Sequence, residues 1–527
     1  MYDTYDENTT RMEQSELFDP NLSVLTAKNV ASGLLILLLV HWAGYLVHNL
    51  YLSPMAKYPG PILSSLTQVP YWYHCIRGDQ IYWIHQLHQK YGPVVRVNPN
   101  ELSYTDGRAW KDIFGHRVGG KPGNGKDTRW YSPPSATGGP TLQTEHDDAM
   151  HGRVRRIFAN AFSHKALVEQ EPLIRRYAKL LVSKTREIVK SSSSAVDLVL
   201  LYNCTTFDIM GDLTFGEPLH LLEDSQLSPW IKAVFSNVKS LDMARVAREY
   251  TWLGPIWRRL IPRSLAESQK LHVQNSKDRV TRRLARARDD DHKDIWSLIL
   301  RDGGKLDEAR MHSNSTFFML AGTETTATSL SGLTYNLLRN PDKMRKLVDE
   351  IRGAFSDPKD MNLVNLQQLP YLHACIEEGL RMYPPAPIGT PRKVAADGAA
   401  ICGKWVPGDT RVYVHHYAAY HSPSNFRNPD AFVPERWMGA PEYESDKRDV
   451  FEPFSYGPRN CLGKNLAYHE IRLILSMMLW TYDMELCDDS LTWSDQKVWT
   501  LWDKPPLFVR LTVRPDMPLI PGSGVSA

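Results

Sequence analysis

The segment Phe454–Gly463 (FSYGPRNCLG) carries the residue types best suited to holding a metal. Gly457 and Pro458 predict a tight turn, and a long apolar helix is expected to start at Leu462, directly after Cys461. A cysteine in that position faces unpaired backbone N–H groups and the positive end of the helix dipole, which lower its pKa and favour the thiolate. The pattern therefore predicts a metal-binding or reactive thiolate rather than an inert buried cysteine.

Three neighbours of Cys461 strengthen this prediction. Arg459 places a positive charge two residues away from the sulfur. Gly463 would let a flat macrocycle approach the backbone closely, because glycine has no side chain. Phe454 can separate the sulfur from water.

A second group of reactive side chains lies in Ser313–Arg339, which is apolar nearly all round and therefore predicts a buried helix. Gly322 leaves one side of this helix without a side chain. The Thr325 hydroxyl is expected to donate to the Ala321 carbonyl one turn earlier, which disturbs the backbone hydrogen bonds of the helix there. Glu324 and Thr325 then form an acid–alcohol pair able to relay protons. Alone, the motif would predict only a kinked helix with a solvent-linked glutamate.

The two segments resemble the signature motifs of cytochromes P450. FSYGPRNCLG matches the family's haem-binding pattern FxxGxRxCxG at every fixed position, and AGTET matches its [AG]GxxT helix motif. The resemblance implies that Cys461 is the axial ligand of haem b iron, with Phe454, Arg459 and Gly463 against the haem. The electron-rich thiolate would then favour O–O cleavage.

The resemblance also assigns the catalytic proton relay to Glu324 and Thr325. Family members that only rearrange peroxides often lack the alcohol, so its presence favours a monooxygenase. A cluster of Glu378, Arg381 and Arg436 is implied as well, because EGLR and PERW resemble the family's ExxR and PERF elements. We expect this cluster to hold the loop behind the haem, where loss of one member would cost about 3–5 kcal/mol.

Haem carries two propionates, which need cationic partners. The segment His151-Gly-Arg-Val-Arg155 resembles the family's WxxxR helix, with histidine in place of the usual tryptophan. An imidazole N–H can still donate to a carboxylate. By resemblance, Arg392 and Arg459 are the other basic anchors.

Helical periodicity dominates the chain between these motifs, and short strand-like runs are few. The expected fold is therefore mainly α with a smaller β lobe, and the resemblance implies the cytochrome P450 fold with the haem between the Ser313 and Leu466 helices. The segments that support it are the helices Glu171–Lys190, Ser313–Arg339 and Leu466–Thr481 and the strands Val94–Asn98, Glu101–Tyr104 and Thr410–His415.

The N-terminal region predicts a single membrane anchor. Val30–Leu52 is mostly apolar and carries no charge, and about 20 such residues span a bilayer. We expect a lumenal tail at 1–29, the anchor at 30–52, a proline-rich linker at 53–62 and a catalytic domain at 63–527. A buried core helix is the alternative. By resemblance, the protein is single-pass at the endoplasmic reticulum membrane with a cytosolic catalytic domain.

Composition excludes several other classes. The 527 residues include 62 Lys and Arg against 59 Asp and Glu, a net charge of +3 that gives little reason to expect nucleic-acid binding. Six cysteines without a CxxC pair argue against a disulfide scaffold and a zinc site, and for a reducing compartment. No GxGxxG motif follows a strand, so electrons must come from another protein. The resemblance implies an NADPH–cytochrome P450 reductase, with cytochrome b5 as a second candidate.

The expected reaction inserts one oxygen atom of O₂ into a lipophilic small molecule. The segment Trp493–Leu507 resembles the C-terminal part of fungal enzymes similar to isotrichodermin hydroxylases, which tailor terpenoid or polyketide secondary metabolites. The segments expected over the haem are Gly115–Glu145, Phe317–Thr325, Pro385–Pro391 and Val498–Trp502.

Three alternatives share parts of this pattern. A haem-thiolate isomerase or dehydratase would not consume O₂ and NADPH in step with product. An oxidase that desaturates or closes rings would consume both and insert no oxygen. A non-enzymatic haem protein would need no Glu324–Thr325 pair.

Overall fold

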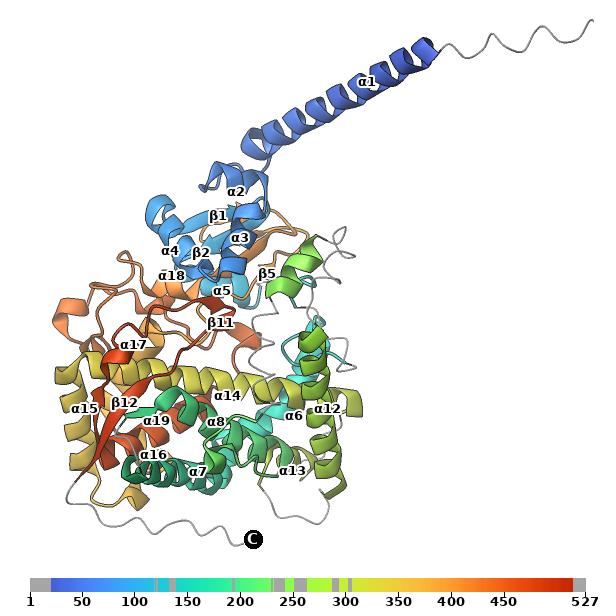
Figure 1. Ribbon diagram of the computed structural model, residues 1–527. Helices are drawn as coiled ribbons and strands as arrows, with labels where there is room; N and C mark the ends of the chain where they lie inside the picture. Colours follow the sequence, from blue (N-terminus) through green and yellow to red (C-terminus); the bar gives the residue numbers. More distant parts are fainter. Residues whose placement is uncertain are drawn as a thin grey trace, which may run out of the picture.

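The computed structural model describes residues 20–117, 119, 122–131, 139–191, 195–228, 231, 242–250, 263–286, 293–301 and 306–514 (Figure 1). Residues 1–19, most of the expected lumenal tail, lie outside these ranges. The expected loop Gly115–Glu145 is described only in part.

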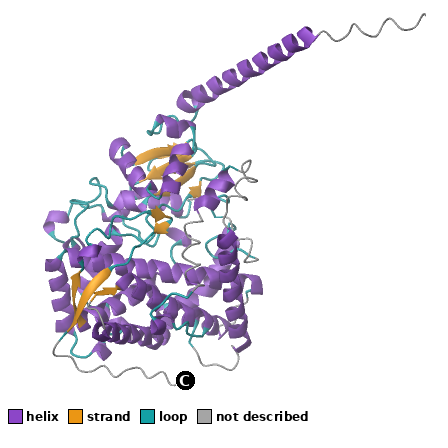
Figure 2. Ribbon diagram, in the orientation of Figure 1, coloured by secondary structure: helices purple, strands orange, loops and turns teal. Residues whose placement is uncertain are grey.

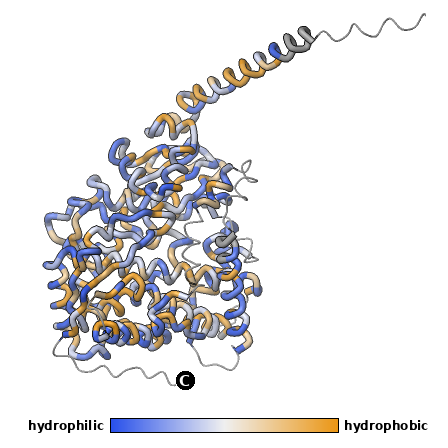
Figure 3. Tube along the Cα trace, viewed as in Figure 1, coloured by the Kyte–Doolittle hydropathy of each residue, from blue (hydrophilic) through white to orange (hydrophobic). Residues whose placement is uncertain are grey.

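Helix α1 (Pro20–Val47) projects from the body of the protein as a long apolar rod, and the π-helix η1 (His48–Leu52) continues it (Figures 1 and 3). Lys28–Leu52 has a mean hydropathy of 2.0, and its most apolar part is not buried against the body, whereas Asn49 near its end is buried. A helix of this length and composition can cross a bilayer. The helix begins ten residues before the expected Val30, and Pro20 is well suited to its first turn because proline lacks an N–H.

The body is mainly helical, with a smaller β part: one group of strands lies near the end that carries α1, and a second group, which includes β12, lies toward the opposite end (Figures 1 and 2). Its α-helices are α2 Ile62–Leu66, α3 Val69–Arg77, α4 Gln80–Tyr91, α5 Arg108–Phe114, α6 Asp148–Ala159, α7 His164–Ser191, α8 Leu198–Phe215, α9 Leu221–Asp224, residues 242–249, α12 Arg263–Arg286, α13 Ile295–Arg301, α14 Glu308–Arg339, α15 Pro341–Ala354, α16 Leu363–Leu366, α17 Pro370–Met382, α18 His416–Tyr420 and α19 Lys464–Thr481. Short 3₁₀ turns are η3 Asn160–Phe162, η5 Pro358–Asp360, η6 Pro434–Met438, η7 Pro441–Tyr443, η8 Arg448–Val450, η9 Gly457–Arg459 and η10 Asp488–Ser490. These bounds confirm the three long helices expected from periodicity.

The main sheet has five strands in the order β1-β2-β8-β5-β3. All neighbours are antiparallel except β2 and β8. A three-stranded sheet has the order β4-β12-β9, and two further pairs are β6-β7 and β10-β11. The strands are β1 Val94–Asn98, β2 Glu101–Tyr104, β3 Gly125–Lys126, β4 Ala195–Asp197, β5 Arg392–Lys393, β6 Ala399–Ile401, β7 Lys404–Val406, β8 Arg411–Val414, β9 Tyr482–Leu486, β10 Val498–Trp499, β11 Leu501–Trp502 and β12 Phe508–Val513. The expected fold class is confirmed.

Helix α14 runs through the middle of the body and packs against α8, α12, α17 and α19 (Figure 1). Gly322 permits the close approach to α8, because a Cβ there would lie 2.7 Å from the Met210 sulfur. The helix ends at Arg339, before the Asn340-Pro341 pair that starts α15. It thus places the AGTET segment between α8 and α19.

Candidate active site

The Cys461 loop is built from backbone conformations that few residues adopt. Gly457 has φ +76°, and a side chain there would collide with the Phe114 carbonyl, so only glycine fits. Ser455 also has a positive φ of 61°. The Cys461 backbone N–H then donates to the Phe454 carbonyl at 2.8 Å, which closes the loop beneath the sulfur.

Helix α19 starts at Lys464, with Gly463 as its cap, and not at Leu462 as expected. Cys461 therefore precedes the helix by three residues, because the 3₁₀ turn and the Phe454 hydrogen bond hold it outside the helical path. Burial raises the pKa of the Cys461 thiol, while the Gly463 N–H, Arg155 and Lys464 oppose the rise. The expected lowering of the pKa at the helix end is present in the contribution of the Gly463 N–H, but burial outweighs it in the protein alone. Coordination to a metal would deprotonate the thiol outright.

Cys461 is accessible even though its surroundings desolvate it, so the sulfur faces an internal space. A Cβ added to Gly463 would meet no atom within 4 Å, so the backbone is open to a flat group at this point. These two observations fit a planar macrocycle with its metal on the sulfur.

Arg155 on α6 fixes the residue that precedes the cysteine. Its Nη1 donates to the Asn460 carbonyl at 2.7 Å and its Nη2 donates to Asn460 Oδ1 at 2.6 Å. A guanidinium that binds two acceptors at once defines an orientation as well as a distance. Arg155 therefore positions the Cys461 loop and also lines the cavity described next.

A cavity of about 600 Å³ beside this loop is strongly cationic. Four arginines and one aspartate line it among the described residues, and His151 is buried at its wall. Burial, followed by the charge of Arg459, lowers the pKa of His151 to about 3. His151 is therefore neutral at physiological pH and can donate one N–H.

Strand β3 brings one further basic residue, Lys126, next to Arg392, which lines this cavity. Lys126 on β3 lies directly opposite Arg392 on β5 in an antiparallel pair. Burial, followed by the charges of Arg392 and Arg459, lowers the pKa of Lys126 to about 6. Arg392 is only 6% exposed, and its Nε has no hydrogen-bond partner among the described residues.

An amine with this pKa is mostly uncharged at physiological pH, and an unpaired buried donor such as the Arg392 Nε is costly. A ligand that brings carboxylates would restore the charge of Lys126 and pair the Arg392 donor, which fits the two propionates of haem. Arg459 already binds Asp148 at 2.6 and 2.9 Å and the Glu145 carbonyl at 2.6 Å. Sequence reasoning missed Lys126, because a two-residue strand within a glycine-rich loop has no periodic pattern.

On α14, the Thr325 hydroxyl donates to the Ala321 carbonyl at 2.7 Å, as the motif predicts. The helix is otherwise mostly buried here, but one stripe stays accessible, and it consists of Phe317, Leu320, Ala321, Gly322 and Thr325. This stripe has the spacing of one helix face, and α14 packs against α19, which follows Cys461. It fits the wall of a mostly apolar substrate site.

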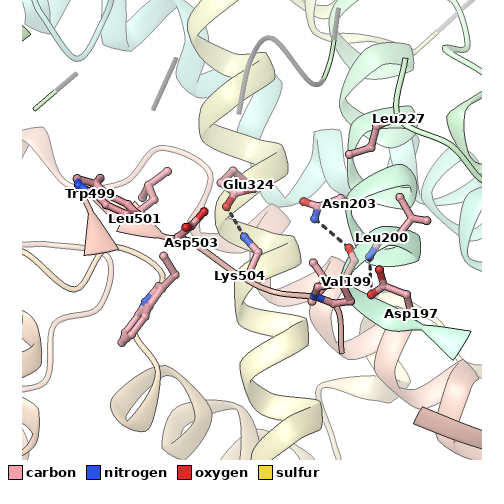
Figure 4. Close-up of a pocket in the computed structure, with 12 residues that line it drawn as sticks. Asp197, Val199, Leu200, Asn203, Leu227, Glu324, Trp499, Leu501, Asp503 and Lys504 are labelled. Atoms are coloured by element: carbon pink, nitrogen blue, oxygen red, sulfur yellow. Dashed lines mark hydrogen bonds and ion pairs between the residues drawn. The ribbon is translucent and has the colours of Figure 1, made fainter. Parts of the chain in front are cut away.

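Glu324 points away from the expected relay partner. Its carboxylate pairs with the ammonium of Lys504 from the C-terminal segment, and in the described part of the chain no hydrogen bond joins it to Thr325 (Figure 4). The reason is that neighbouring residues of a helix project about 100° apart. The direct acid–alcohol pair expected from sequence is thus replaced by an ion pair that sequence reasoning missed.

Glu378, Arg381 and Arg436 form one fully buried network. Arg381 donates to both Glu378 oxygens at 2.8 and 2.9 Å, and Arg436 Nε donates to Glu378 Oε1 at 3.1 Å. Asp446, which the sequence did not indicate, pairs with Arg436 and balances the charge. Arg381 also donates to the carbonyls of Tyr420, Pro429 and Ala431 at 2.8, 2.6 and 2.9 Å, and so fixes the segment before η6.

Of the remaining expected residues, Phe454 lies beside the Cys461 loop and Trp502 lies in the C-terminal segment. Phe454 packs on Tyr468 of α19 with ring centroids 5.1 Å apart, and so supports the Cys461 loop. Trp502 stacks on Tyr383 at 4.2 Å and donates to the Pro384 carbonyl at 2.7 Å. That contact joins the expected pocket segment Val498–Trp502 to Tyr383 and Pro384, directly before the expected segment Pro385–Pro391, and it gives Trp502 a structural role.

Comparison with known proteins matches residues 54–509 to the family model Cytochrome P450. The chain is 48% identical over 473 residues to the cytochrome P450 monooxygenase efuB of Hormonema carpetanum, covering 89% of this chain and 93% of that protein. It is 44% identical over 470 residues to the cytochrome P450 monooxygenase FUM2 of Gibberella moniliformis, covering 88% and 99%. It is 42% identical over 470 residues to the cytochrome P450 monooxygenase AMT3 of Alternaria alternata, covering 89% and 96%. The matched region contains every site residue described above.

Proposed function

The chain belongs to the cytochrome P450 family, whose members bind haem through a thiolate, and we propose that it inserts one oxygen atom of O₂ into a lipophilic small molecule. As in its monooxygenase relatives, the reaction class is oxidoreduction. The single observation that carries the proposal is the accessible Cys461 sulfur beside an open Gly463 and a cationic cavity.

Cys461 is the residue proposed to bind the iron. The haem supplies an iron that activates O₂, and the thiolate donates the electron density that favours O–O cleavage. His151, Arg155, Arg392 and Arg459 are proposed to hold the propionates, because they line the cavity. Lys126 is proposed as a further partner, because it lies opposite Arg392. Arg155 and Phe454 keep the loop in place from either side.

Thr325 is the proposed proton donor to the reacting oxygen. Its hydroxyl donates to the Ala321 carbonyl, which fixes its orientation, and it lies on the accessible stripe of α14. Glu324 is the proposed source of that proton, and since its carboxylate pairs with Lys504, it would reach the hydroxyl through water or after its side chain rotates. The Glu378, Arg381 and Arg436 network is proposed to be structural.

The substrate is proposed to be lipophilic, because the accessible stripe of α14 offers Phe317, Leu320 and Ala321 to it. The fungal origin of the relatives supports a terpenoid or polyketide secondary metabolite as the substrate class. Hydroxylation and epoxidation both fit this site.

Electrons are proposed to come from an NADPH–cytochrome P450 reductase, with cytochrome b5 as a second donor, because membership of the family implies a redox partner. The proposed location is the endoplasmic reticulum membrane, with residues 30–52 as the anchor, 1–29 lumenal, 53–62 as the linker and 63–527 cytosolic. The apolar helix that projects from the body supports an anchor (Figure 3).

The test uses microsomes that contain the protein and a reductase, supplied with NADPH, isotopically heavy O₂ and an extract of fungal metabolites. A new product that carries one heavy oxygen atom supports the proposal. A product without heavy oxygen but with NADPH consumption would indicate desaturation or ring closure. A product formed without NADPH or O₂ would indicate an isomerase or a dehydratase and would contradict the proposal.

A further inference from the structure

Strand β1 lies beside the point where the apolar rod of α1 and η1 leaves the body, and it carries a buried cation (Figure 1). Arg96 of this strand is only 1% exposed. Burial lowers the pKa of Arg96, but a guanidinium stays protonated in proteins, so the site holds a positive charge. Its hydrogen-bond partners among the described residues are backbone carbonyls and not carboxylates. Buried charges are costly, so these carbonyls are what keeps the cation in place.

The Arg96 guanidinium joins three segments of the chain. Its Nη1 donates to the Asn49 carbonyl of η1 at 2.9 Å. Its Nη2 donates to the Pro99 carbonyl in the turn between β1 and β2 at 2.8 Å and to the Ser65 carbonyl of α2 at 3.4 Å. A rigid planar group that holds several acceptors at once fixes their relative orientation.

The Asn49 carbonyl is free to accept because of the local sequence. In the π-helix η1 the Ser53 N–H donates to the His48 carbonyl, five residues earlier, at 2.7 Å. In that pattern the donor to Asn49 would come from residue 54, which is a proline and has no N–H. The other helix carbonyl that Arg96 binds also lies in the last turn of its helix, α2. One cation thus caps the carbonyl ends of two helices, where the helix dipole is negative.

The segment that follows η1, the expected linker 53–62, is packed on the body. The Arg96 backbone N–H donates to the Pro59 carbonyl at 2.7 Å. Met55 and Tyr58 are buried, with 3% and 4% exposed. A flexible linker would leave such side chains in solvent, so this segment holds the end of the rod close to β1.

We propose, on the basis of the proposed membrane anchor, that Arg96 is a positioning residue that locks the anchor helix to the catalytic domain at one angle. Through this lock, the bilayer that holds α1 sets the orientation of the whole domain.

Helix α2 shows what a fixed angle achieves. It packs against η1, and its Ile62 and Leu63 are 70% and 58% exposed. Apolar side chains held beside the end of a membrane helix suit the boundary of the bilayer, and a freely pivoting domain would not keep them there. The Tyr45 hydroxyl of α1 adds a hydrogen bond to the Leu66 carbonyl at 2.8 Å, but this bond is exposed and competes with water. The buried guanidinium is therefore the principal link.

The alternative is that Arg96 only stabilises the lobe that contains β1 and β2. That role predicts a looser lobe in Arg96 variants and an unchanged angle of the anchor as long as the lobe stays folded. The two roles therefore differ in two measurable distances, one from the anchor to the body and one within the body.

The experiment measures these distances by pulsed electron spin resonance in the haem-loaded, full-length protein in lipid nanodiscs. Spin labels on Leu38→Cys in α1 and on Met438→Cys report the anchor against the body, and both positions are exposed. Labels on Lys90→Cys, at the exposed end of α4, and on Met438→Cys report the body alone. Cys402→Ala and Cys487→Ala remove the two partly accessible cysteines that a label would otherwise reach.

The wild-type protein should give one narrow anchor-to-body distance. Arg96→Gln should lose this narrow peak and give a broad distribution, because a single amide cannot hold the Asn49 and Pro99 carbonyls together. The distance within the body should stay narrow in the same variant. Arg108→Gln is the matched control, because Arg108 is an exposed arginine of the same lobe that pairs with Asp106 at 2.7 Å, and it should keep both wild-type peaks.

A broad anchor-to-body distribution in the wild type, or a wild-type peak in Arg96→Gln, would overturn the proposal. Equal broadening of both distances in Arg96→Gln would also overturn it, because Arg96 would then be a structural residue of the lobe. If Arg96→Gln fails to bind haem, Arg96→Lys carries the same test. Its ammonium keeps the buried charge, but one nitrogen cannot span two carbonyls that different guanidinium nitrogens hold.

Failure of the proposed anchor is seen separately in the same samples. A label on Leu38→Cys within a bilayer is reached by dissolved oxygen, whereas a label outside the bilayer is reached by a water-soluble nickel chelate. The second result would contradict the membrane anchor, whatever the two distances are.

Discussion

Lys126 and Arg392 stand directly opposite each other on the antiparallel strands β3 and β5, at the edge of a cavity lined by three further arginines. Burial and the charges of Arg392 and Arg459 lower the pKa of Lys126 to about 6, so its amine is mostly uncharged at physiological pH in the haem-free protein. Folding without haem therefore requires Lys126 to give up its proton, and an anionic ligand would restore the charge. If the pair binds a propionate, as proposed, haem binding gains from a residue that costs stability in the haem-free protein.

The first prediction is that Lys126→Gln stabilises the haem-free protein and speeds the loss of haem from the haem-loaded protein. The haem-free variant should be more stable than the wild type at neutral pH, because an amide at this position has no proton to lose when the protein folds. The haem-loaded variant should lose haem to apomyoglobin about 10- to 100-fold faster, because a charged hydrogen bond contributes about 1.5–3 kcal/mol.

Lys393→Gln is the matched control, because Lys393 is the exposed neighbour on β5 and binds Asp409 at 2.9 Å. It should change neither the unfolding free energy nor the rate of haem loss beyond error. If Lys126→Gln destabilises both forms, Lys126 is a structural residue and no propionate contact is needed to explain it.

The second prediction concerns Thr325→Ala. The variant should keep the haem-thiolate spectrum, since Thr325 bonds only within its own helix, and should release a larger fraction of O₂ as hydrogen peroxide. The measurement is peroxide formed per NADPH in the reductase-supported system. Ser331→Ala is the control, because Ser331 makes the same 2.7 Å back-bond to Ala327 but is fully buried. Equal peroxide release by both variants would remove Thr325 from the relay.

The third prediction is a large loss of stability in Glu378→Gln. The change leaves buried Arg381 without its carboxylate and Arg436 with Asp446 alone, and it should lower the free energy of unfolding by about 3–5 kcal/mol, with loss of bound haem. Urea unfolding and haem content measure it. Glu485→Gln breaks an exposed ion pair with Arg510 of the same 2.8 Å length and should cost about 0–1 kcal/mol. Similar costs for the two variants would mean that the buried network is not needed.

The fourth prediction is the pH dependence of that network. Burial raises the pKa of Glu378, but Arg381 and Arg436 outweigh it and hold the pKa below its ordinary value. A carboxyl of this kind stabilises the fold above its unfolded pKa of about 4.3, and the contribution is lost as pH falls through the folded pKa. The difference in unfolding free energy between wild type and Glu378→Gln should therefore be constant from about pH 5 to 7. Below that range it should shrink, and a difference that widens on acidification would contradict the assignment.

The parts of the site that follow from local sequence were predictable. The Cys461 loop depends on Gly457 and Pro458, and the Thr325 back-bond joins residues one turn apart, so both are set within a few residues. The long helices were predictable for the same reason, because their apolar spacing repeats. The start of α19 was misplaced by two residues, since a 3₁₀ turn and one backbone hydrogen bond decide it.

The parts that depend on distant residues were not predictable from one sequence. Lys504 meets Glu324 only because the C-terminal segment returns to α14, and Asp446 meets Arg436 only after η6 turns back. Lys126 faces Arg392 through a strand of two residues, which has no periodicity to reveal it. In each case tertiary packing chooses the partner, and neither residue type nor spacing indicates the choice.

The central claim is that Cys461 binds haem iron as a thiolate, and the absorption spectrum of the dithionite-reduced, CO-bound protein in microsomes tests it most directly. The wild-type protein should show a Soret band far to the red of histidine-ligated haem, and Cys461→Ala should show no such band and no activity. Cys402→Ala is the control, because Cys402 is also partly accessible and lies away from the loop. A wild-type band at the position of histidine-ligated haem, or a red-shifted band and turnover that survive in Cys461→Ala, would contradict the claim.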